Sequence, residues 1–175
     1  MNKTITVFGS SQPVETDKQY KLACELGSLL AKKGFDVCTG GFFGIMEAVS
    51  KGAVENGGEA IGVTVNIWGL DANEYLTKEV KCSTLFERIN KLIEAGDGFV
   101  ILQGGTGTLL ELAAAWELSN KGLMDNKPIA CHSSMWHGII SIMNNQMEYE
   151  GRSTHLVKSF KTTETITNYL TNQLV

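Results

Sequence analysis

Residues 98–111, with the sequence GFVILQGGTGTLLE, decide the fold because two kinds of structure meet in them. Gly98–Leu102 is a short, almost wholly apolar run, which predicts a buried strand. A helical pattern follows from Thr108 to about Lys121, and a glycine-rich turn at 104–107 separates the two. A strand, a tight turn and a helix in this order form half of the crossover that joins two parallel strands.

The same alternation of strands and helices extends in both directions along the chain. It predicts an α/β fold, a parallel sheet with helices on both faces. Residues 66–80 show no clean period and are expected to form a loop with a short helix. The other predicted strands are Thr4–Phe8, Phe35–Thr39, Glu59–Val65 and Lys127–Cys131, and the other predicted helices are Asp17–Lys33, Gly44–Asn56, Thr84–Ala95, Met135–Met147 and Thr163–Leu174.

The composition is typical of a globular protein with one core. The 175 residues, 43% apolar and 19% charged, are expected to form a single domain over residues 1–175. The 15 Lys and Arg against 19 Asp and Glu give a net charge of −4, which argues against nucleic acid as a partner. No run approaches the roughly 20 apolar residues of a membrane span, and the start lacks a signal-peptide core. We therefore expect a cytoplasmic protein without membrane contact.

Neither a metal nor a cofactor is expected from the sequence. The cysteines stand far apart and lack the spacing of zinc or iron–sulfur ligands, so reduced, buried thiols are expected. The histidines also lack ligand spacing and have no evident nucleophile beside them, which favours structural or surface positions. The residues concerned are Cys24, Cys38, Cys82, Cys131, His132, His137 and His155.

Three glycine-containing turns follow predicted strands, at the sheet edge where ligands bind in parallel α/β folds. In the third turn, glycines let the backbone approach a ligand, and the N-terminus of the next helix offers free N–H groups to an anion, most naturally phosphate. A plain strand-to-helix turn is the alternative. A dinucleotide-binding motif would need glycine at Leu110, and a P-loop would need a Gly-Lys-Ser/Thr sequence that is absent. The turns are Gly9-Ser10-Ser11, Gly40-Gly41 and Gly104-Gly105-Thr106-Gly107-Thr108.

Glu111 has two interpretations. The sequence from Thr108 to Glu111 fits a capping box, in which the glutamate bonds back to the first amide of the helix. The predicted helix is apolar almost all round, however, so a carboxylate in it needs a partner and would lie within a turn of the expected phosphate. This second interpretation makes Glu111 a catalytic or ligand-binding residue. The apolar helix also indicates a subunit interface.

Arg88 is the candidate partner of Glu111. It lies just beyond the apolar arc of the predicted helix Thr84–Ala95. Most arginines in such a position are solvated, with only the apolar stem packed on the protein. An ion pair and a solvated side chain therefore both remain open.

These motifs resemble those of the LOG ("Lonely guy") phosphoribohydrolases. The family hallmark Pro-Gly-Gly-x-Gly-Thr-x-x-Glu matches residues 103–111, with Gln103 in place of proline. An upstream family motif, Met-His-x-Arg-Lys, falls on residues 85–89, where only Arg88 is kept. The similarity covers about residues 3–145 and includes the first-strand turn. The segment 40–49 resembles the family's Gly-Gly-x-x-Gly-Leu-Met sequence.

The resemblance implies a Rossmann-like fold, usually as a homodimer. It also implies hydrolysis of the N-glycosidic bond of nucleoside 5′-monophosphates, AMP or cytokinin riboside monophosphates, to free base and ribose 5-phosphate. Arg88 and Glu111 would be the catalytic pair. The phosphate would bind at Gly104, Gly105, Thr106, Gly107 and Thr108, and the rest of the substrate at Gly9, Ser10, Ser11, Gly40, Gly41 and Met46.

Some departures from the family pattern bear on function. Phe86 and Ile89 replace the histidine and lysine of the upstream motif, Glu47 is an additional carboxylate, and Gln103 replaces proline. In these features the chain resembles nucleotide-binding or molybdenum-cofactor carrier proteins of the same fold, so a non-catalytic carrier is the alternative function. No lysine stands in a recognisable pyridoxal-phosphate site, which argues against an amino-acid decarboxylase.

Overall fold

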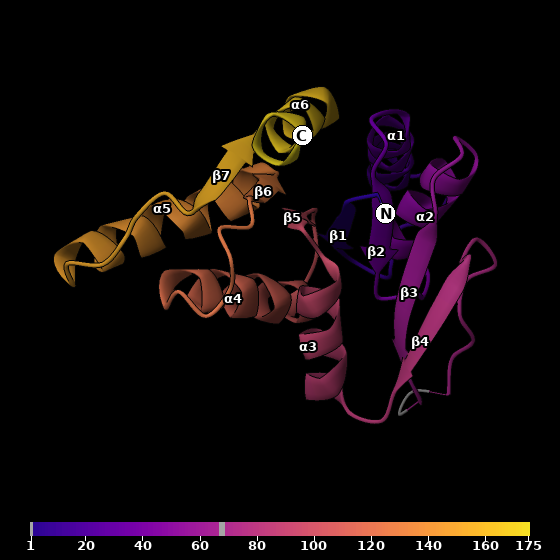
Figure 1. The fold of residues 1–175 in the computed structure, drawn as a ribbon, viewed down its shortest axis with the longest axis horizontal. Helices are drawn as coiled ribbons and strands as arrows, with labels where there is room; N and C mark the ends of the chain where they lie inside the picture. Colours follow the sequence, from indigo (N-terminus) through magenta and orange to yellow (C-terminus); the bar gives the residue numbers. More distant parts are fainter. Residues whose placement is uncertain (1, 67–68) are drawn as a thin grey trace.

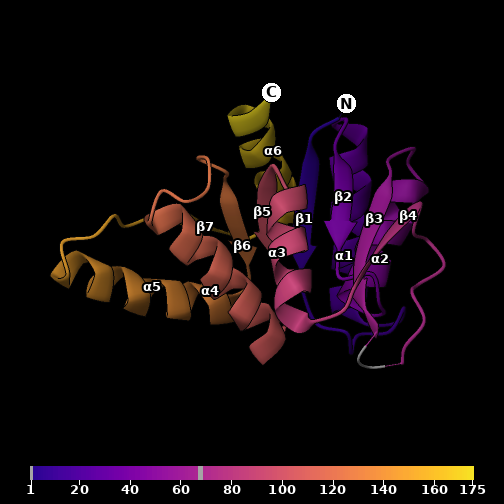
Figure 2. The same cartoon turned by 60° about the horizontal axis from the view of Figure 1, so that its bottom comes forward.

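The computed structural model describes residues 2–66 and 69–175. Within them, seven strands form one parallel sheet in the order β4-β3-β2-β1-β5-β6-β7, which runs from right to left in Figure 2. The predicted parallel α/β fold is confirmed. The strands are β1 (Thr4–Phe8), β2 (Asp36–Thr39), β3 (Ala60–Val65), β4 (Lys78–Cys82), β5 (Gly98–Ile101), β6 (Ile129–His132) and β7 (Val157–Phe160).

Helices cover both faces of the sheet (Figure 1). The first, second and last of the described helices pack on one face, and the other three pack on the opposite face. Each face therefore has its own hydrophobic core. The helices are α1 (Lys18–Lys32), α2 (Ile45–Val54), α3 (Leu85–Ala95), α4 (Thr106–Asn120), α5 (Ser134–Tyr149) and α6 (Thr163–Leu174).

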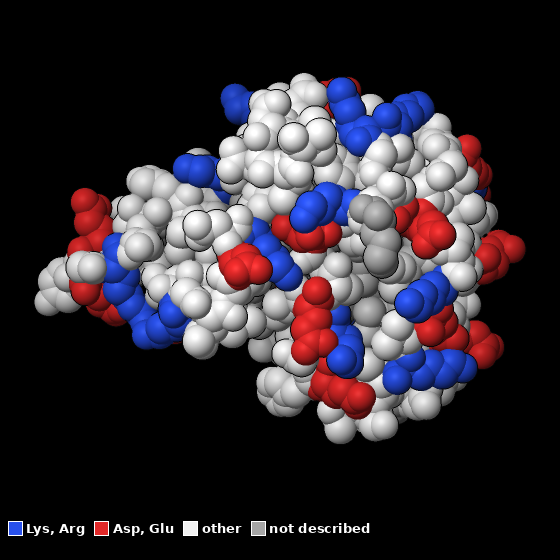
Figure 3. Space-filling view, viewed as in Figure 1, with Lys and Arg blue, Asp and Glu red and all other residues white. Residues whose placement is uncertain are grey.

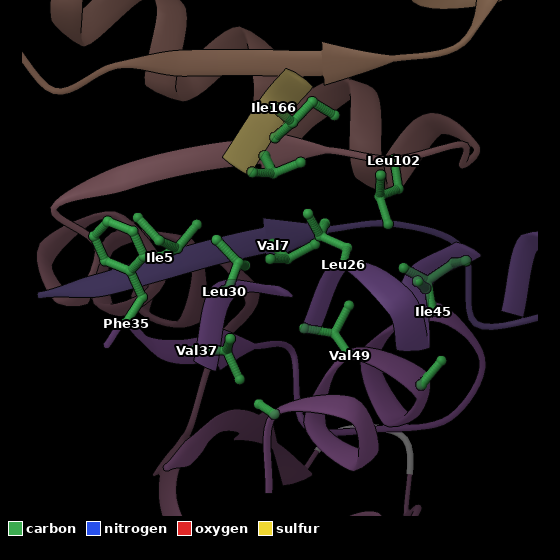
Figure 4. Packing of buried hydrophobic residues seen from close by; sticks show 14 of the residues in the cluster. Ile5, Val7, Leu26, Leu30, Phe35, Val37, Ile45, Val49, Leu102 and Ile166 are labelled. Atoms are coloured by element: carbon green, nitrogen blue, oxygen red, sulfur yellow. The ribbon is translucent and has the colours of Figure 1, made fainter. Parts of the chain in front are cut away.

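The central strand β1 is buried on both sides because its side chains alternate between the two cores. Ile5 and Val7 pack beneath α1 and α2, as Figure 4 shows. Phe8 belongs to the other core. Thr6 is fully buried, and its hydroxyl donates to the carbonyl of Leu92 in α3, 2.9 Å away. This hydrogen bond satisfies the polar group and ties α3 to the middle of the sheet.

Glycines allow α1 and α2 to approach closely. A Cβ on Gly27 would lie 2.2 Å from the carbonyl oxygen of Val49, and one on Gly52 would lie 2.0 Å from that of Cys24. No side chain fits at either position without moving the helices apart. This contact packs α1 closely against α2 on one face of the sheet.

The sequence pattern did not predict β4 and β7, which are the two edge strands of the sheet. The loop expected over residues 66–80 is wrong for its last part, because β4 begins at Lys78 and pairs with β3. Residues 69–77 hold no helix, and 67–68 lie outside the described residues. β7 was also not expected. Edge strands carry charged and exposed side chains, so they lack the apolar run that marks the central strands.

All four cysteines are free thiols, as expected. Three of them are buried, and burial raises the pKa of Cys38 to about 12. No helix in the described part of the chain is long and apolar enough to cross a membrane.

Candidate functional site

The candidate site lies where the strand order reverses, between the carboxyl ends of β1 and β5. Chains that leave such a point run to opposite sides of the sheet and open a crevice for a ligand. The loops are tied together: the Ser10 amide donates to the Gln103 carbonyl (3.0 Å), and the Ile45 amide donates to the Ser10 carbonyl (2.8 Å). The three predicted glycine turns therefore belong to one site.

Two glycines make this close approach of the loops feasible. A Cβ on Gly9 would lie 2.4 Å from Cγ2 of Ile45. Gly44, just before α2, has a φ of +69°, and a Cβ there would lie 2.5 Å from the carbonyl oxygen of Ser10. A side chain at either position would push α2 away from the end of β1.

A cavity of about 560 Å³ opens at this crevice. Its volume is within the range of pockets that hold small molecules. Its walls come from the loops after β1, β2, β3 and β5 and from α2, α3 and α4. They are formed by Gly9, Ser10, Ser11, Gln12, Phe42, Phe43, Met46, Leu70, Arg88, Gly105, Thr106, Gly107, Thr108 and Glu111.

The N-terminus of α4 forms one end of the cavity. The helix begins at Thr106, two residues earlier than predicted, and Gly105 is its N-cap without a side-chain hydrogen bond. Amides in a first helical turn have no acceptor within the helix, and the helix dipole adds partial positive charge. Because residues 105–108 line the cavity, these amides lie at its wall. The end of the cavity suits an anion.

The capping-box interpretation of Glu111 is wrong. Thr108 is the third residue of α4 rather than its cap, so Glu111 lies in the second turn. Its side chain does not bond back to the N-cap amide and instead forms an ion pair with Arg88. The pairing of side chains from two helices could not be read from the local sequence of either one.

Arg88 is buried and held in place from three sides. It is 5% exposed, although arginines at this helix position are commonly solvated. Nε donates to the Val63 carbonyl at 2.8 Å, Nη2 to the Gly40 carbonyl at 3.1 Å, and Nη1 to Oε1 of Glu111 at 3.4 Å. The guanidinium carbon also lies 5.7 Å from the centre of the Phe42 ring. The loop after β2, strand β3 and helix α4 thus fix one orientation of the guanidinium.

The side chain of Glu111 binds its proton more tightly than an ordinary glutamate does. Burial raises the pKa of Glu111 to about 7, and the charge and hydrogen bond of Arg88 oppose this shift. Burial also lowers the pKa of Arg88, but a guanidinium stays charged in proteins. A carboxyl with a pKa near neutrality can take up and release a proton at physiological pH.

Most of the predicted site residues line the cavity, and three do not. Gly40 lies behind the wall, and a Cβ there would be 1.8 Å from Nη2 of Arg88. The carbonyl of Gly41 accepts hydrogen bonds from the backbone and side-chain amides of Asn73. A Cβ on Gly104 would lie 2.1 Å from the Thr108 hydroxyl oxygen. These glycines shape the wall but do not form it.

Four cavity residues were not predicted: Gln12, Phe42, Phe43 and Leu70. The aromatic pair directly follows Gly40-Gly41, so its position after a glycine turn was a usable signal. Gln12 follows the first turn in the same way. Leu70 carries no such signal, because it reaches the site from a segment without periodicity.

Known proteins are similar to this chain in sequence and in fold. The chain is 32% identical over 133 residues to the cytokinin riboside 5′-monophosphate phosphoribohydrolase of Mycobacterium tuberculosis, covering 72% of this chain and 68% of that one. It is 30% identical over 130 residues to the enzyme of that name from Rhodococcoides fascians, covering 72% and 65%. These relatives confirm the resemblance to the LOG proteins.

A solved structure resembles this chain over its whole length. The molybdenum cofactor binding protein of Rippkaea orientalis superimposes with a TM-score of 0.81 at 22% identity, covering 100% of this chain and 99% of that one. At this identity the likeness concerns the fold alone. The model of the SLOG cluster4 family matches residues 2–160, and the chain therefore belongs to that family.

Proposed function

We propose that this protein hydrolyses the N-glycosidic bond of a nucleoside 5′-monophosphate, giving free base and ribose 5-phosphate. The observation that carries the proposal is the buried Arg88–Glu111 ion pair in the wall of a cavity that ends at a helix N-terminus. Relatives with about 30% identity are named for this reaction on cytokinin riboside monophosphates. AMP is the simplest substrate of the class.

The 5′-phosphate would bind at the start of α4. Residues 105–108 line that end of the cavity, and their amides suit the phosphate oxygens. The hydroxyls of Thr106 and Thr108 add donors. A phosphate fixed there orients the ribose and lowers the entropic cost of reaching the transition state.

Glu111 would act on the ribose and the attacking water. The C1′–N bond breaks as positive charge develops on the ribose, and a nearby carboxylate stabilises that charge. The water oxygen bonds to C1′ and one of its protons passes through Glu111 to the leaving base. The second proton remains on the new C1′ hydroxyl. A pKa of about 7 suits Glu111 both to accept a proton from the water and to donate it to the leaving base.

Arg88 would keep Glu111 in position and partly ionised. Its hydrogen bonds to the carbonyls of Val63 and Gly40 fix the guanidinium before any ligand arrives. A fixed positive charge beside the carboxyl limits how far burial raises its pKa. Without Arg88, Glu111 would stay protonated to higher pH and would lose its role as a base.

A carrier that binds a phosphorylated ligand without turnover is the second candidate. The structural match to a molybdenum cofactor binding protein covers the whole chain, and the cavity with its anion-binding end would serve either role. The family's histidine and lysine are replaced here by Phe86 and Ile89, and neither lines the cavity. The buried acid–base pair favours the hydrolase.

We also propose that the protein forms a homodimer through α4 and α5. Both helices expose large apolar side chains on the described surface, and Figure 3 shows a patch of uncharged surface in this part of the molecule, bordered by charged side chains. Burial against a second copy would remove these side chains from water. They are Leu109, Leu110, Met135, Ile142 and Met143.

Incubation of the purified protein with AMP, with free adenine followed by chromatography, tests the hydrolase. The parent protein should release adenine, and Glu111→Gln should lower kcat by about 10²- to 10⁴-fold with little change in AMP affinity. Glu117→Gln is the matched control, since Glu117 lies on the same helix but is half exposed and pairs with Arg152. AMP that binds and stays intact would reject the hydrolase in favour of the carrier.

A further inference from the structure

A second cavity of about 400 Å³ adjoins the first, on the side of α2. The two cavities share Ser11, Gln12 and Phe43 as a common wall. Its lining differs from that of the first cavity, because it includes three carboxylates and no lysine or arginine. The remaining lining residues are Pro13, Val14, Glu15, Tyr20, Gly44, Glu47, Glu74 and Tyr75. We call it the acidic cavity.

The acidic cavity carries uncompensated negative charge. Glu15 forms an ion pair with Lys51, whose ammonium also lies 5.6 Å from the centre of the Tyr75 ring. Glu47 and Glu74 form no ion pair within the part of the chain that the structure describes. Two carboxylates therefore remain to attract a cation. Glu47 is one of the residues by which this sequence departs from the LOG pattern.

The hydroxyl of a largely buried tyrosine in the cavity wall independently points to a ligand there. Tyr20 is 4% exposed, and its hydroxyl has no hydrogen-bond partner among the described residues. Burial raises its pKa, as does the charge of Glu47, while Lys51 opposes the shift. The hydroxyl thus lies beside the charged groups of the cavity. Because no described residue bonds to this hydroxyl, it is available to a ligand in the cavity.

The arrangement suits an organic cation better than a metal ion. Among residues 2–66 and 69–175, no three His, Cys, Asp or Glu side chains lie close enough together to hold a metal ion. The rings of Tyr20, Tyr75 and Phe43 line the cavity together with the carboxylates, and aromatic faces attract organic cations.

We propose that the acidic cavity binds the ammonium group of a small organic amine. The ammonium donates to Glu47, Glu74 and the Tyr20 hydroxyl oxygen, and the alkyl chain packs on Val14 and Phe43. The shared wall places this cation next to the occupant of the main cavity, whose far end suits an anion. Opposite charges in neighbouring cavities favour simultaneous occupation. The inference goes beyond the hydrolase and does not depend on it.

Calorimetric titration with putrescine, a short diamine, tests the proposal. Butanediol, which has the same chain without the charge, is the matched ligand. Putrescine should bind at least about tenfold more tightly than butanediol, and added salt should weaken it. Glu47→Gln and Glu74→Gln should each weaken putrescine binding about tenfold, whereas Glu148→Gln, an exposed change on α5, should have no effect. Equal binding of the two ligands, or variants that bind putrescine as the parent does, would overturn the proposal.

Tyr20→Phe provides a second readout that separates a ligand contact from a structural role. Removal of the hydroxyl should change Tm little in the absence of amine, because it breaks no hydrogen bond to the described residues. The increase in Tm caused by putrescine should become smaller in the variant, because bound ligand stabilises the folded state in proportion to its affinity. An unchanged increase would show that the hydroxyl does not face the ligand. AMP hydrolysis enters neither measurement, so the two proposals can fail separately.

Discussion

Arg88 and Glu111 meet across two helices, with Nη1 of the arginine 3.4 Å from Oε1 of the glutamate. The side chains are 6% and 12% exposed, and both line the same cavity. A buried ion pair at a ligand cavity is a weak source of stability, because desolvation offsets the attraction between the charges. The Arg88–Glu111 pair contributes to function by fixing the geometry of the two side chains and by altering the pKa of the carboxyl.

The pH dependence of catalysis should report the proton on Glu111. Since burial raises its pKa to about 7, the carboxylate base is scarce below that pH and abundant above it. We expect kcat/KM for AMP to rise through an apparent pKa near 7 and then level off. The residual rate of Glu111→Gln should lack this rise. A parent profile that is flat between pH 5 and about 8 would exclude Glu111 as the base.

The same pKa predicts how stability changes with pH. The folded-state value of about 7 exceeds the ordinary value of 4.5, so between these pH values the folded protein binds more protons than the unfolded chain. The free energy of unfolding should therefore fall as the pH rises through this window. Glu111→Gln should remove a decrease on the order of 3 kcal/mol. Urea denaturation of both proteins at a series of pH values measures the difference in slope.

Gly40→Ala should inactivate the protein without unfolding it. The added Cβ would lie 1.8 Å from Nη2 of Arg88, so the guanidinium must leave its place beside Glu111. We expect kcat to fall at least about tenfold, because a displacement of a catalytic group by about 1 Å lowers the rate that much or more. Gly138→Ala on α5, where a Cβ meets nothing within 4 Å, is the control. Full activity in Gly40→Ala would contradict the positioning role of Gly40.

Gly52→Ala should destabilise the fold. Alanine normally favours a helix over glycine by about 1 kcal/mol, but here its Cβ would lie 2.0 Å from the Cys24 carbonyl oxygen. Separation of α1 from α2 should cost about 1–3 kcal/mol in the free energy of unfolding. Chemical denaturation measures the change, and Gly138→Ala should be neutral or stabilising under the same conditions.

Leu110→Lys should separate the proposed dimer. Leu110 is 37% exposed on α4, and a lysine within an apolar interface would lose its hydration. Light scattering coupled to gel filtration should give about twice the monomer mass for the parent and the monomer mass for the variant. Val175→Lys, at the exposed end of the chain beyond α6, should leave the mass unchanged. A monomeric parent would refute the dimer.

The sequence by itself determined the central sheet and the helices around it. Strands such as Thr4–Phe8 are recognisable because burial on both faces leaves only apolar or small residues in them. Glycine turns after these strands indicated the edge of the sheet where the cavity lies. The edge strands Lys78–Cys82 and Val157–Phe160 were missed, since a strand with one neighbour tolerates charged side chains.

Only the tertiary structure decided what the polar residues do. The pattern around Glu111 is the same for a helix cap and for an active-site carboxylate, and the position of the first helical residue separated the two. Arg88 has the spacing of a solvated arginine, but in the fold it is buried and donates to the carbonyls of Val63 in β3 and Gly40 in the loop after β2. Helical and strand periods express short-range geometry, whereas the burial and pKa of a side chain depend on neighbours distant in sequence.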